Sequence, residues 1–221
     1  MSTRSRVLRY RWAIFGVCVG AVMLTRVGGA RAEDHDFALH LVSSTVVNNG
    51  PLPLITVDNF PDANGANTCA PDGEVGGNQS PELSWSHVPE DTRTFVVVMY
   101  DVTASFTHWG MYNIPASTRS LPLNAGIAGS TFGRQVANDF GDLSYDGPCP
   151  PATVNPVVHQ YVVTVYALDR SLHIPAHGDF PAGSEALYHA LLDAGRHDHV
   201  LASASITGLF SSVAGAVKRA M

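Results

Sequence analysis

The chain has 221 residues, of which 45% are hydrophobic and 14% are charged, with 13 Lys and Arg against 19 Asp and Glu. This composition excludes a disordered chain, which would have few apolar residues and a high charge. The 20 Gly and 14 Pro follow no period, which excludes a collagen-like or coiled-coil rod, and the length is typical of a globular domain with a substantial core.

The first 32 residues have the three parts of a secretory signal peptide. Arginines precede an apolar run at 12–24, and Ala30-Arg31-Ala32 supplies a site of the small-x-small type. The apolar run is shorter than the about 20 residues that a membrane-spanning helix needs. We therefore expect cleavage near Ala32 and export to the periplasm or the exterior, with a retained anchor as the alternative.

Removal of residues 1–32 changes the charge of the protein. Residues 33–221, which we expect to form a single domain, hold 7 basic and 19 acidic groups, a net charge of −12 with neutral histidines. So acidic a chain lacks the basic surface that DNA and RNA require, and its attraction to anionic membranes is poor. We expect no nucleic-acid partner and no stable membrane insertion once the leader is gone.

The rest of the chain reads mainly as short strands between long loops rich in Gly, Pro, Asn and Asp. Strands are predicted at 39–47, 53–57, 83–85, 94–100, 108–114, 159–168 and 199–210, and loops at 58–80 and 117–156. A helix is predicted from Ser184, as N-cap, to Gly195, and a short one within 211–220.

The order of these elements predicts the fold. Many short strands followed by one or two late helices favour a mainly β protein, a two-sheet antiparallel β-sandwich with Greek-key connections. The strands at 94–100 and 159–168 are continuous runs of apolar residues, which are typical of strands buried on both faces.

The familiar catalytic and metal-binding motifs are missing from the sequence. It contains no GxSxG, no Walker loop, no GxGxxG and no HExxH. His197 and His199 form an HxH pair, which could belong to a zinc site or could be two surface histidines. Because no third ligand is evident, we predict neither a metal nor a cofactor.

Polar residues at the ends of apolar strands are the positive signal. Asp101 ends one predicted strand, while His108 and His159 begin two others. Strand alternation places Tyr161 on the same face as His159. If these strands are neighbours, the carboxylate can hold one imidazole in a fixed tautomer and leave its other nitrogen for a ligand. The group suits a small oxyanion, although a turn-forming Asp and structural histidines would give the same pattern.

Cysteine usage suggests one cross-link. Cys18 lies in the leader, so Cys69 and Cys149 remain as a pair. In an exported protein an even pair favours a disulfide. Two unpaired buried thiols or a metal pair are the alternatives.

Several motifs, in order, resemble those of the phosphatidylethanolamine-binding protein family, in particular its bacterial Raf-kinase-inhibitor-like branch. They run over about residues 40–210, nearly all of the mature chain. They are SPELSW at 80–85 with VPEDT at 88–92, HW at 108–109 leading to YNIPA at 112–116, NDFG at 138–141, YDGPCPP at 145–151, and HQY at 159–161 with VYALD at 165–169.

The resemblance implies a β-sandwich with a small anion-binding pocket at one end, which takes phosphate of the phosphorylethanolamine type or related anions. In the family's motifs, Asp101 corresponds to the first Asp of a DPDxP loop and His108 to the histidine after it. His159 and Tyr161 correspond to the outer residues of an HRY motif, and Gly147-Pro148 to a Gly-Pro wall. The residues singled out by strand position are thus the ones that the resemblance assigns to the pocket.

The chain also departs from the family's pattern. DPDxP stands here as DVTAS at 101–105, and HRY as HQY, so an Asp, two prolines and an Arg are missing. The segment 152–158 is longer than usual. We expect a secreted or periplasmic binding protein for a small anionic ligand rather than an enzyme. An inhibitor or interaction module acting on a kinase or protease, and a lyase, cyclase or hydrolase that uses the Asp/His group, remain the alternatives.

Overall fold

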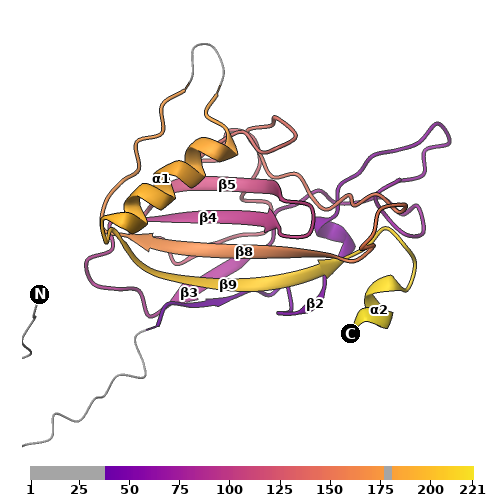
Figure 1. Ribbon diagram of the computed structural model, residues 1–221, viewed down its shortest axis with the longest axis horizontal. Coiled ribbons are helices and arrows are strands. Elements are labelled where there is room, and N and C mark those ends of the chain that lie inside the picture. The colour runs from indigo at the N-terminus through magenta and orange to yellow at the C-terminus, as the bar shows by residue number, and fades with distance from the viewer. Residues whose placement is uncertain (1–37, 177–180) are drawn as a thin grey trace, which may run out of the picture. The chain divides into compact units, whose positions relative to one another are not determined.

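The computed structural model describes residues 38–176 and 181–221 (Figure 1). The leader that the sequence predicts at 1–32 lies outside the described residues, so the division into leader and domain stays a prediction. The strands are β1 (His40–Val42), β2 (Gly50–Pro51), β3 (Leu83–Ser86), β4 (Thr94–Asp101), β5 (Phe106–Pro115), β6 (Ser120–Leu121), β7 (Arg134–Gln135), β8 (His159–Leu168) and β9 (Val200–Phe210). The helices are the 3₁₀ turn η1 (Leu54–Thr56), α1 (Ser184–Arg196) and α2 (Ala216–Ala220).

The strands form two sheets, as the sequence predicts. A three-stranded sheet has the order β1-β3-β6, and a six-stranded sheet has the order β2-β9-β8-β4-β5-β7. All pairings are antiparallel except that of the short β2 with β9, which is parallel. The predicted fold class, a mainly β protein with late helices, is confirmed.

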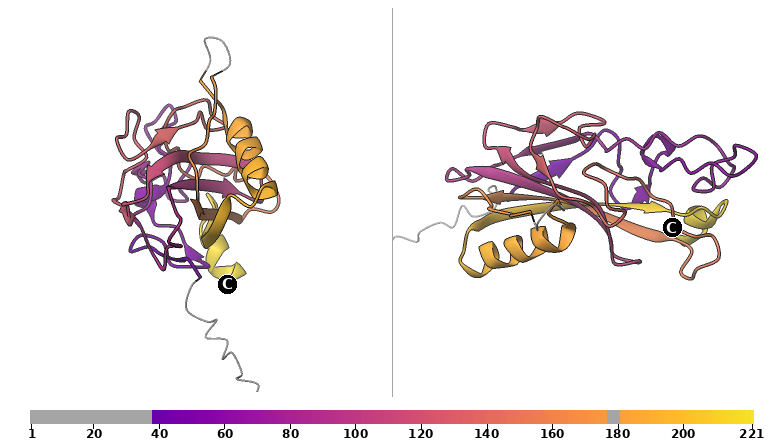
Figure 2. Two further views of the ribbon diagram at one scale, coloured as in Figure 1. Left: turned by 90° about the vertical axis from the view of Figure 1, so that its left-hand side faces the viewer. Right: turned by 90° about the horizontal axis from the view of Figure 1, so that it is seen from above.

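Both faces of the central strand β4 are covered by clusters of buried apolar side chains. Phe95, Val97 and Met99 pack toward the three-stranded sheet, in one cluster with Leu83 and Trp85 of β3. The alternate residues Val96 and Val98 belong to a second cluster that contains the buried face of α1, namely Leu187, Leu191 and Ala194. Figure 2 shows α1 on one side of the large sheet and the small sheet on the other. This double cover explains why the sequence of β4 is apolar without alternation.

The expectation that β8 is also buried on both faces was wrong. Its burial alternates, with His159, Tyr161, Val163 and Val165 buried and the intervening residues exposed or half-exposed. On that outer face Thr164 shares a hydrogen bond with Ser205 of β9 at 2.8 Å. The apolar run in β8 therefore reflects β-branched residues on a half-covered face rather than full burial.

Two predictions near the N-terminal end of the described chain need correction. The predicted strand at 53–57 is instead the 3₁₀ turn η1 (Leu54–Thr56) with its flanking residues, and of 39–47 only His40–Val42 is a strand. The carbonyls of Leu54, Ile55 and Val57 accept hydrogen bonds from the backbone N–H groups of 77–79. These residues thus bond to a loop instead of to a sheet, although their composition favours a strand.

The late helix forms where the sequence predicts it, but its N-cap differs. Gly183 takes the cap position in an extended conformation, without a side-chain hydrogen bond to the helix. The hydroxyl of Ser184 donates instead to Asp139 Oδ1. The first turn of α1 is in this way tied to the loop that follows β7.

The structure contains the disulfide between Cys69 and Cys149, with the two Cα atoms 4.4 Å apart. It joins the loop 58–80 to the segment that precedes β8. Within the described ranges, no helix has the length and hydropathy that crossing a membrane requires.

Candidate functional site

The predicted site residues lie at one end of the large sheet, where β4 and β9 end and β8 begins, toward the right of Figure 1. A cavity of about 260 Å³ opens there, and we call it the pocket. Its lining residues are Asp101, Ala104, Phe106, His108, Phe140, Cys149, Pro150, Pro151, His159 and Tyr161. Four of the six residues that the sequence assigns to the site, Asp101, His108, His159 and Tyr161, therefore share one cavity.

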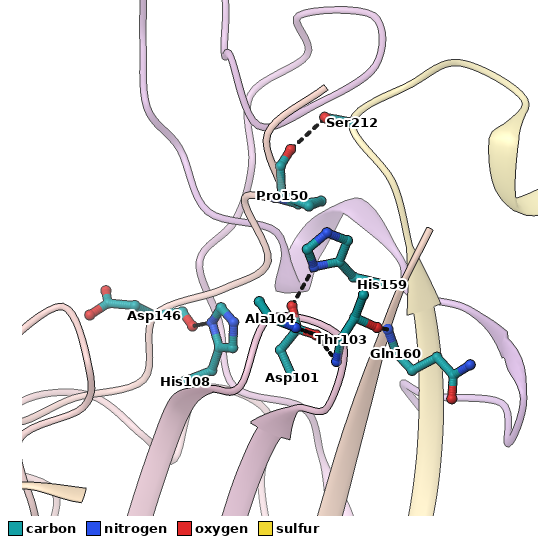
Figure 3. Close-up of polar contacts among 9 residues, drawn as sticks. All are labelled: Asp101, Thr103, Ala104, His108, Asp146, Pro150, His159, Gln160 and Ser212. Carbon is teal, nitrogen blue, oxygen red and sulfur yellow. Dashed lines mark hydrogen bonds and ion pairs between the residues drawn. The ribbon is translucent and has the colours of Figure 1, made fainter. Parts of the chain in front are cut away.

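Asp101 and His159 form a hydrogen-bonded pair in the pocket (Figure 3). Nδ1 of His159 lies 2.6 Å from Oδ2 of Asp101, and both side chains are almost completely buried. The carboxylate accepts, so Nδ1 carries the proton and the ring is held in a fixed orientation. The other ring nitrogen, Nε2, takes no part in this hydrogen bond.

The other oxygen of Asp101 organises the turn between β4 and β5. Oδ1 accepts hydrogen bonds from the backbone N–H groups of Thr103 and Ala104, at 2.8 and 3.1 Å. Four residues in a row, 101–104, thus form an Asx-type turn at the pocket edge. The carboxylate both shapes this turn and orients the imidazole.

Two buried polar atoms of the pocket have no hydrogen-bond partner among the described residues. They are Nε2 of His159 and the hydroxyl of Tyr161. Burial, and then the negative charge of Asp101, raise the pKa of Tyr161 far above its usual value, so the hydroxyl keeps its proton and is a donor. Leaving such a group unpaired costs about 1–3 kcal/mol. The pocket thus holds two buried polar atoms whose hydrogen-bonding capacity is unused among the described residues.

His108 faces the same pocket from β5. Its Nδ1 donates to the backbone carbonyl of Asp146 at 2.7 Å, which fixes the tautomer because a carbonyl can only accept. Burial lowers the pKa of His108 below 6.5, and the hydrogen bond to Asp146 only partly offsets this effect. The ring is therefore neutral near pH 7. Its centroid lies 5.2 Å from that of Tyr161, in an edge-to-face contact.

Gly147 and Pro148 lie outside the lining of the pocket, unlike the expectation from the sequence. The N–H of Gly147 donates to Asn78 Oδ1 at 2.7 Å, and a Cβ at Gly147 would come within 2.2 Å of the carbonyl oxygen of Thr56. The carbonyl of Pro148 accepts from the N–H of Asp58. These two residues anchor the wall, and the three that follow, Cys149 to Pro151, form its surface.

Besides Cys149, Pro150 and Pro151 of the wall segment, three lining residues were not predicted from the sequence to belong to the site: Ala104, Phe106 and Phe140. Phe106 begins β5 two residues before His108, so strand alternation could have placed it on the same face. Phe140 lies in the NDFG motif, but only the course of a long loop brings it to the pocket. Ala104 lies in the turn that Asp101 shapes.

Residue 160, at which the chain departs from the HRY motif, does not line the pocket. Gln160 is exposed on the outer face of β8, and in Figure 3 its side chain points away from His159. Its backbone N–H donates to Thr103 Oγ1 and its carbonyl accepts from Val102. Residue 160 therefore acts on the turn 101–105 through its backbone, since its side chain faces solvent.

His197 and His199 lie at the other end of the large sheet from the pocket. Their rings stack with centroids 6.3 Å apart, and Nδ1 of His199 lies 3.0 Å from a carboxylate oxygen of Asp169. In the part of the chain that the structure describes, no group of three His, Cys, Asp or Glu side chains is arranged to hold a metal ion. His197 is exposed, whereas His199 is half-buried beside Asp169.

Comparisons with known proteins agree with the motifs. The model of a family described as phosphatidylethanolamine-binding protein matches residues 42–211. UPF0098 protein YbhB of Escherichia coli K12 is 39% identical over 146 residues, which cover 63% of this chain and 85% of the relative. UPF0098 protein YbcL of the same organism is 38% identical over 62% of this chain and 74% of the relative.

Solved structures give the same result at the level of the fold. The crystal structure of E. coli YbcL, described as a new member of the mammalian PEBP family, superposes with a TM-score of 0.61 at 30% identity, covering 78% of this chain and 98% of that one. A putative phosphatidylethanolamine-binding protein homologue of Chlamydia trachomatis superposes with a TM-score of 0.57 at 25% identity, over 79% and 98% of the two chains.

Proposed function

The chain belongs to the phosphatidylethanolamine-binding protein family, and we propose that it binds a small anionic ligand in the pocket at the end of its large sheet. The observation that carries this proposal is the pair of buried, unpartnered polar atoms, Nε2 of His159 and the hydroxyl of Tyr161. A phosphate or phosphate ester supplies the oxygens that such atoms can bind.

The two atoms have complementary roles toward a phosphate monoester. The hydroxyl of Tyr161 donates to a phosphate oxygen, because its raised pKa keeps it protonated. Nε2 of His159 is an acceptor in the neutral ring, so it binds the P–O–H of a monoanion, or donates if the ring takes up the proton. Either way the complex holds a proton between the imidazole and the ligand.

The charge of the site limits the affinity. Within the described residues, the lining contains no Lys or Arg, and the charge of Asp101 is already engaged with His159 and two backbone N–H groups. A ligand with one negative charge therefore suits the pocket better than a dianion. We expect weak binding, since a fully charged phosphate meets no cation that is always charged.

Calorimetric titration of the purified protein with inorganic phosphate and O-phosphorylethanolamine tests this function. The His159→Ala variant should lose the binding of both compounds, because it removes one of the two binding atoms. A His197→Ala variant is the matched control, since that histidine lies far from the pocket, and its affinity should equal that of the wild type. Equal affinity in His159→Ala and in the wild type would contradict the proposal.

We also propose that the protein acts outside the cytoplasm, after removal of residues 1–32. The three-part pattern of the leader supports export, and so does the Cys69–Cys149 disulfide, because such bonds persist in oxidising compartments. Intact-mass analysis of the protein recovered from the periplasm or medium should give a chain that begins near Glu33. A full-length chain retained in the cytoplasm would contradict this.

Catalysis is a second candidate function, and the Asp101–His159 pair is the observation that favours it. A carboxylate that orients an imidazole whose second nitrogen is free is the arrangement of a general base in many hydrolases. Among the described residues, the lining offers no hydroxyl or thiol nucleophile beyond Tyr161, since Cys149 is in the disulfide. Turnover of 4-nitrophenyl phosphate or acetate that disappears in His159→Ala would establish this function in place of simple binding.

A further inference from the structure

Four rings line one side of the pocket, and we call them the aromatic wall: Phe106, His108, Phe140 and Tyr161. The ring centroids of Phe106 and Phe140 are 4.6 Å apart, and those of Phe106 and His108 are 5.1 Å apart. His108 contacts Tyr161 in turn, with centroids 5.2 Å apart. A group attached to an anion at the Tyr161 hydroxyl would therefore lie along these rings.

Phe140 is unusual in this wall because it remains 49% exposed while it lines the cavity. Its edge-to-face contacts with Phe106 and His108 hold the ring in place, so it loses little freedom when a ligand covers it. A ligand that covered this ring would bury apolar surface at little entropic cost.

Four lining residues outside the aromatic wall are apolar as well. Ala104, Cys149, Pro150 and Pro151 carry no charge and no side-chain donor that is free to bind a ligand. The carbonyl of Pro150 is held by the hydroxyl of Ser212 at 2.6 Å (Figure 3), so this part of the wall is fixed. The pocket thus combines one polar end with a rigid apolar mouth.

The size of the pocket exceeds what a phosphate needs. If each of the four oxygens takes about the volume of a water, ~30 Å³, the ion fills about half of the cavity. The cavity measures about 260 Å³, so about half of it is left for the rest of a ligand, and Phe106 and Phe140 are among the residues that line it. That space fits a planar apolar group of a few heavy atoms.

We propose that the ligand of this pocket carries an aromatic ring, or a similar planar apolar group, directly beside its anionic group, as in an aryl phosphate monoester. This inference rests on the proposed anion site and adds to it the chemistry of the rest of the ligand. The anionic group binds at His159 and Tyr161, and the ring packs against Phe106 and Phe140.

An ammonium group is the other chemistry that an aromatic wall can bind, through cation–π contacts. Such a site usually offers a carboxylate as well, but the only acid in the lining, Asp101, is buried and already paired with His159. Within the described chain, the pocket mouth therefore favours an uncharged ring. A choline ester serves as the test of this choice.

The experiment is a set of calorimetric titrations of the purified full chain with methyl phosphate, phenyl phosphate and O-phosphorylcholine. Phenyl phosphate should bind about tenfold more tightly than methyl phosphate, which corresponds to about 1.4 kcal/mol, and more tightly than phosphorylcholine. Phe140→Ala should abolish this advantage, while Phe140→Trp should keep it. Phe60→Ala, which removes an exposed ring outside the lining, should keep it too.

The outcomes separate this inference from the proposed function. If phenyl and methyl phosphate bind equally, and both bindings depend on His159, the anion site stands and the aromatic preference is wrong. If phosphorylcholine binds most tightly, the wall recognises a cation and the inference is overturned. If no phosphate ester binds, both the site and the inference fail. If phenyl phosphate kept its advantage in Phe140→Ala, this would also contradict the inference that the phenyl ring packs against Phe140.

Discussion

Asp101 pairs in register with Tyr161 of the neighbouring strand, yet its carboxylate accepts a hydrogen bond from His159, two residues away along β8. The diagonal contact is possible because residues two apart on a strand point to the same face. One carboxylate thus lies next to both of the side chains that have free polar atoms in the pocket. The geometry of β4 against β8 therefore builds the site.

Asp101→Asn should weaken both stability and ligand binding. The amide can still accept the two backbone N–H groups of 103 and 104, but it no longer offers a charged acceptor to Nδ1 of His159. Loss of a buried hydrogen bond to a charged group should lower the free energy of unfolding by about 2 kcal/mol. Urea denaturation measures this change. Asp91→Asn, an exposed position outside the pocket, is the control and should unfold like the wild type.

Stability should decrease in mild acid because of His108. Burial lowers the pKa of this residue below 6.5, so the unfolded chain binds a proton that the folded protein does not. The stability linked to the neutral form of His108 is fully present above pH 6.5. It is lost as the pH falls from 6.5 toward the pKa that His108 has in the folded protein. Thermal unfolding between pH 7.5 and 5 measures the slope, which should be smaller in His108→Gln. An identical slope in the two proteins would assign the effect to other groups.

The disulfide should contribute much of the stability of the pocket wall. Cys69 and Cys149 are 80 residues apart, and a loop of this length corresponds to about 4 kcal/mol in the chain-entropy model. Cys69→Ser combined with Cys149→Ser should therefore lower the melting temperature markedly, and a reductant should have the same effect on the wild type alone. A double variant that melts like the oxidised wild type would show that the cross-link is dispensable.

Gly147→Ala should be strongly destabilising, because its new Cβ would lie within 2.2 Å of the Thr56 carbonyl oxygen and 2.6 Å of the Asp58 nitrogen. Backbone atoms cannot move aside like a flexible side chain, so a loss of more than about 2 kcal/mol is expected. Gly195→Ala in α1 is the matched control: apart from its chain neighbours and the adjacent backbone of its own helix, nothing lies within 4 Å of the added methyl. That change should stabilise the protein by up to about 1 kcal/mol. Chemical denaturation compares the two variants.

How far the sequence predicts this protein depends on the part of the chain. The long strands β4, β5, β8 and β9 follow from their apolar β-branched residues, and the meeting of Asp101, His159 and Tyr161 follows from strand ends and alternation. Residues 53–57 were misassigned because their backbone partners lie in a loop with no pattern of its own. Phe140 was missed for the same reason, since its place depends on the path of a long loop.

The assignment of Gly147 and Pro148 illustrates a different limit. The family resemblance placed them in the pocket wall, and they do lie in that segment, but Gly147 packs closely against the backbone of 56–58 and neither residue lines the cavity. The direction in which a loop residue points depends on tertiary contacts that a linear motif does not contain. The motif identified the segment and not its exposed surface.

The hydroxyl of Tyr161 offers the most direct test, because Tyr161→Phe removes one buried, unpartnered oxygen and leaves the ring in place. Calorimetric titration with inorganic phosphate should show an affinity at least about tenfold weaker than in the wild type, since a donor to the anion is lost. The free variant should be at least as stable as the wild type, because an unpaired buried hydroxyl has been removed. Unchanged affinity for phosphate in Tyr161→Phe would contradict the placement of the anion at this end of the sheet.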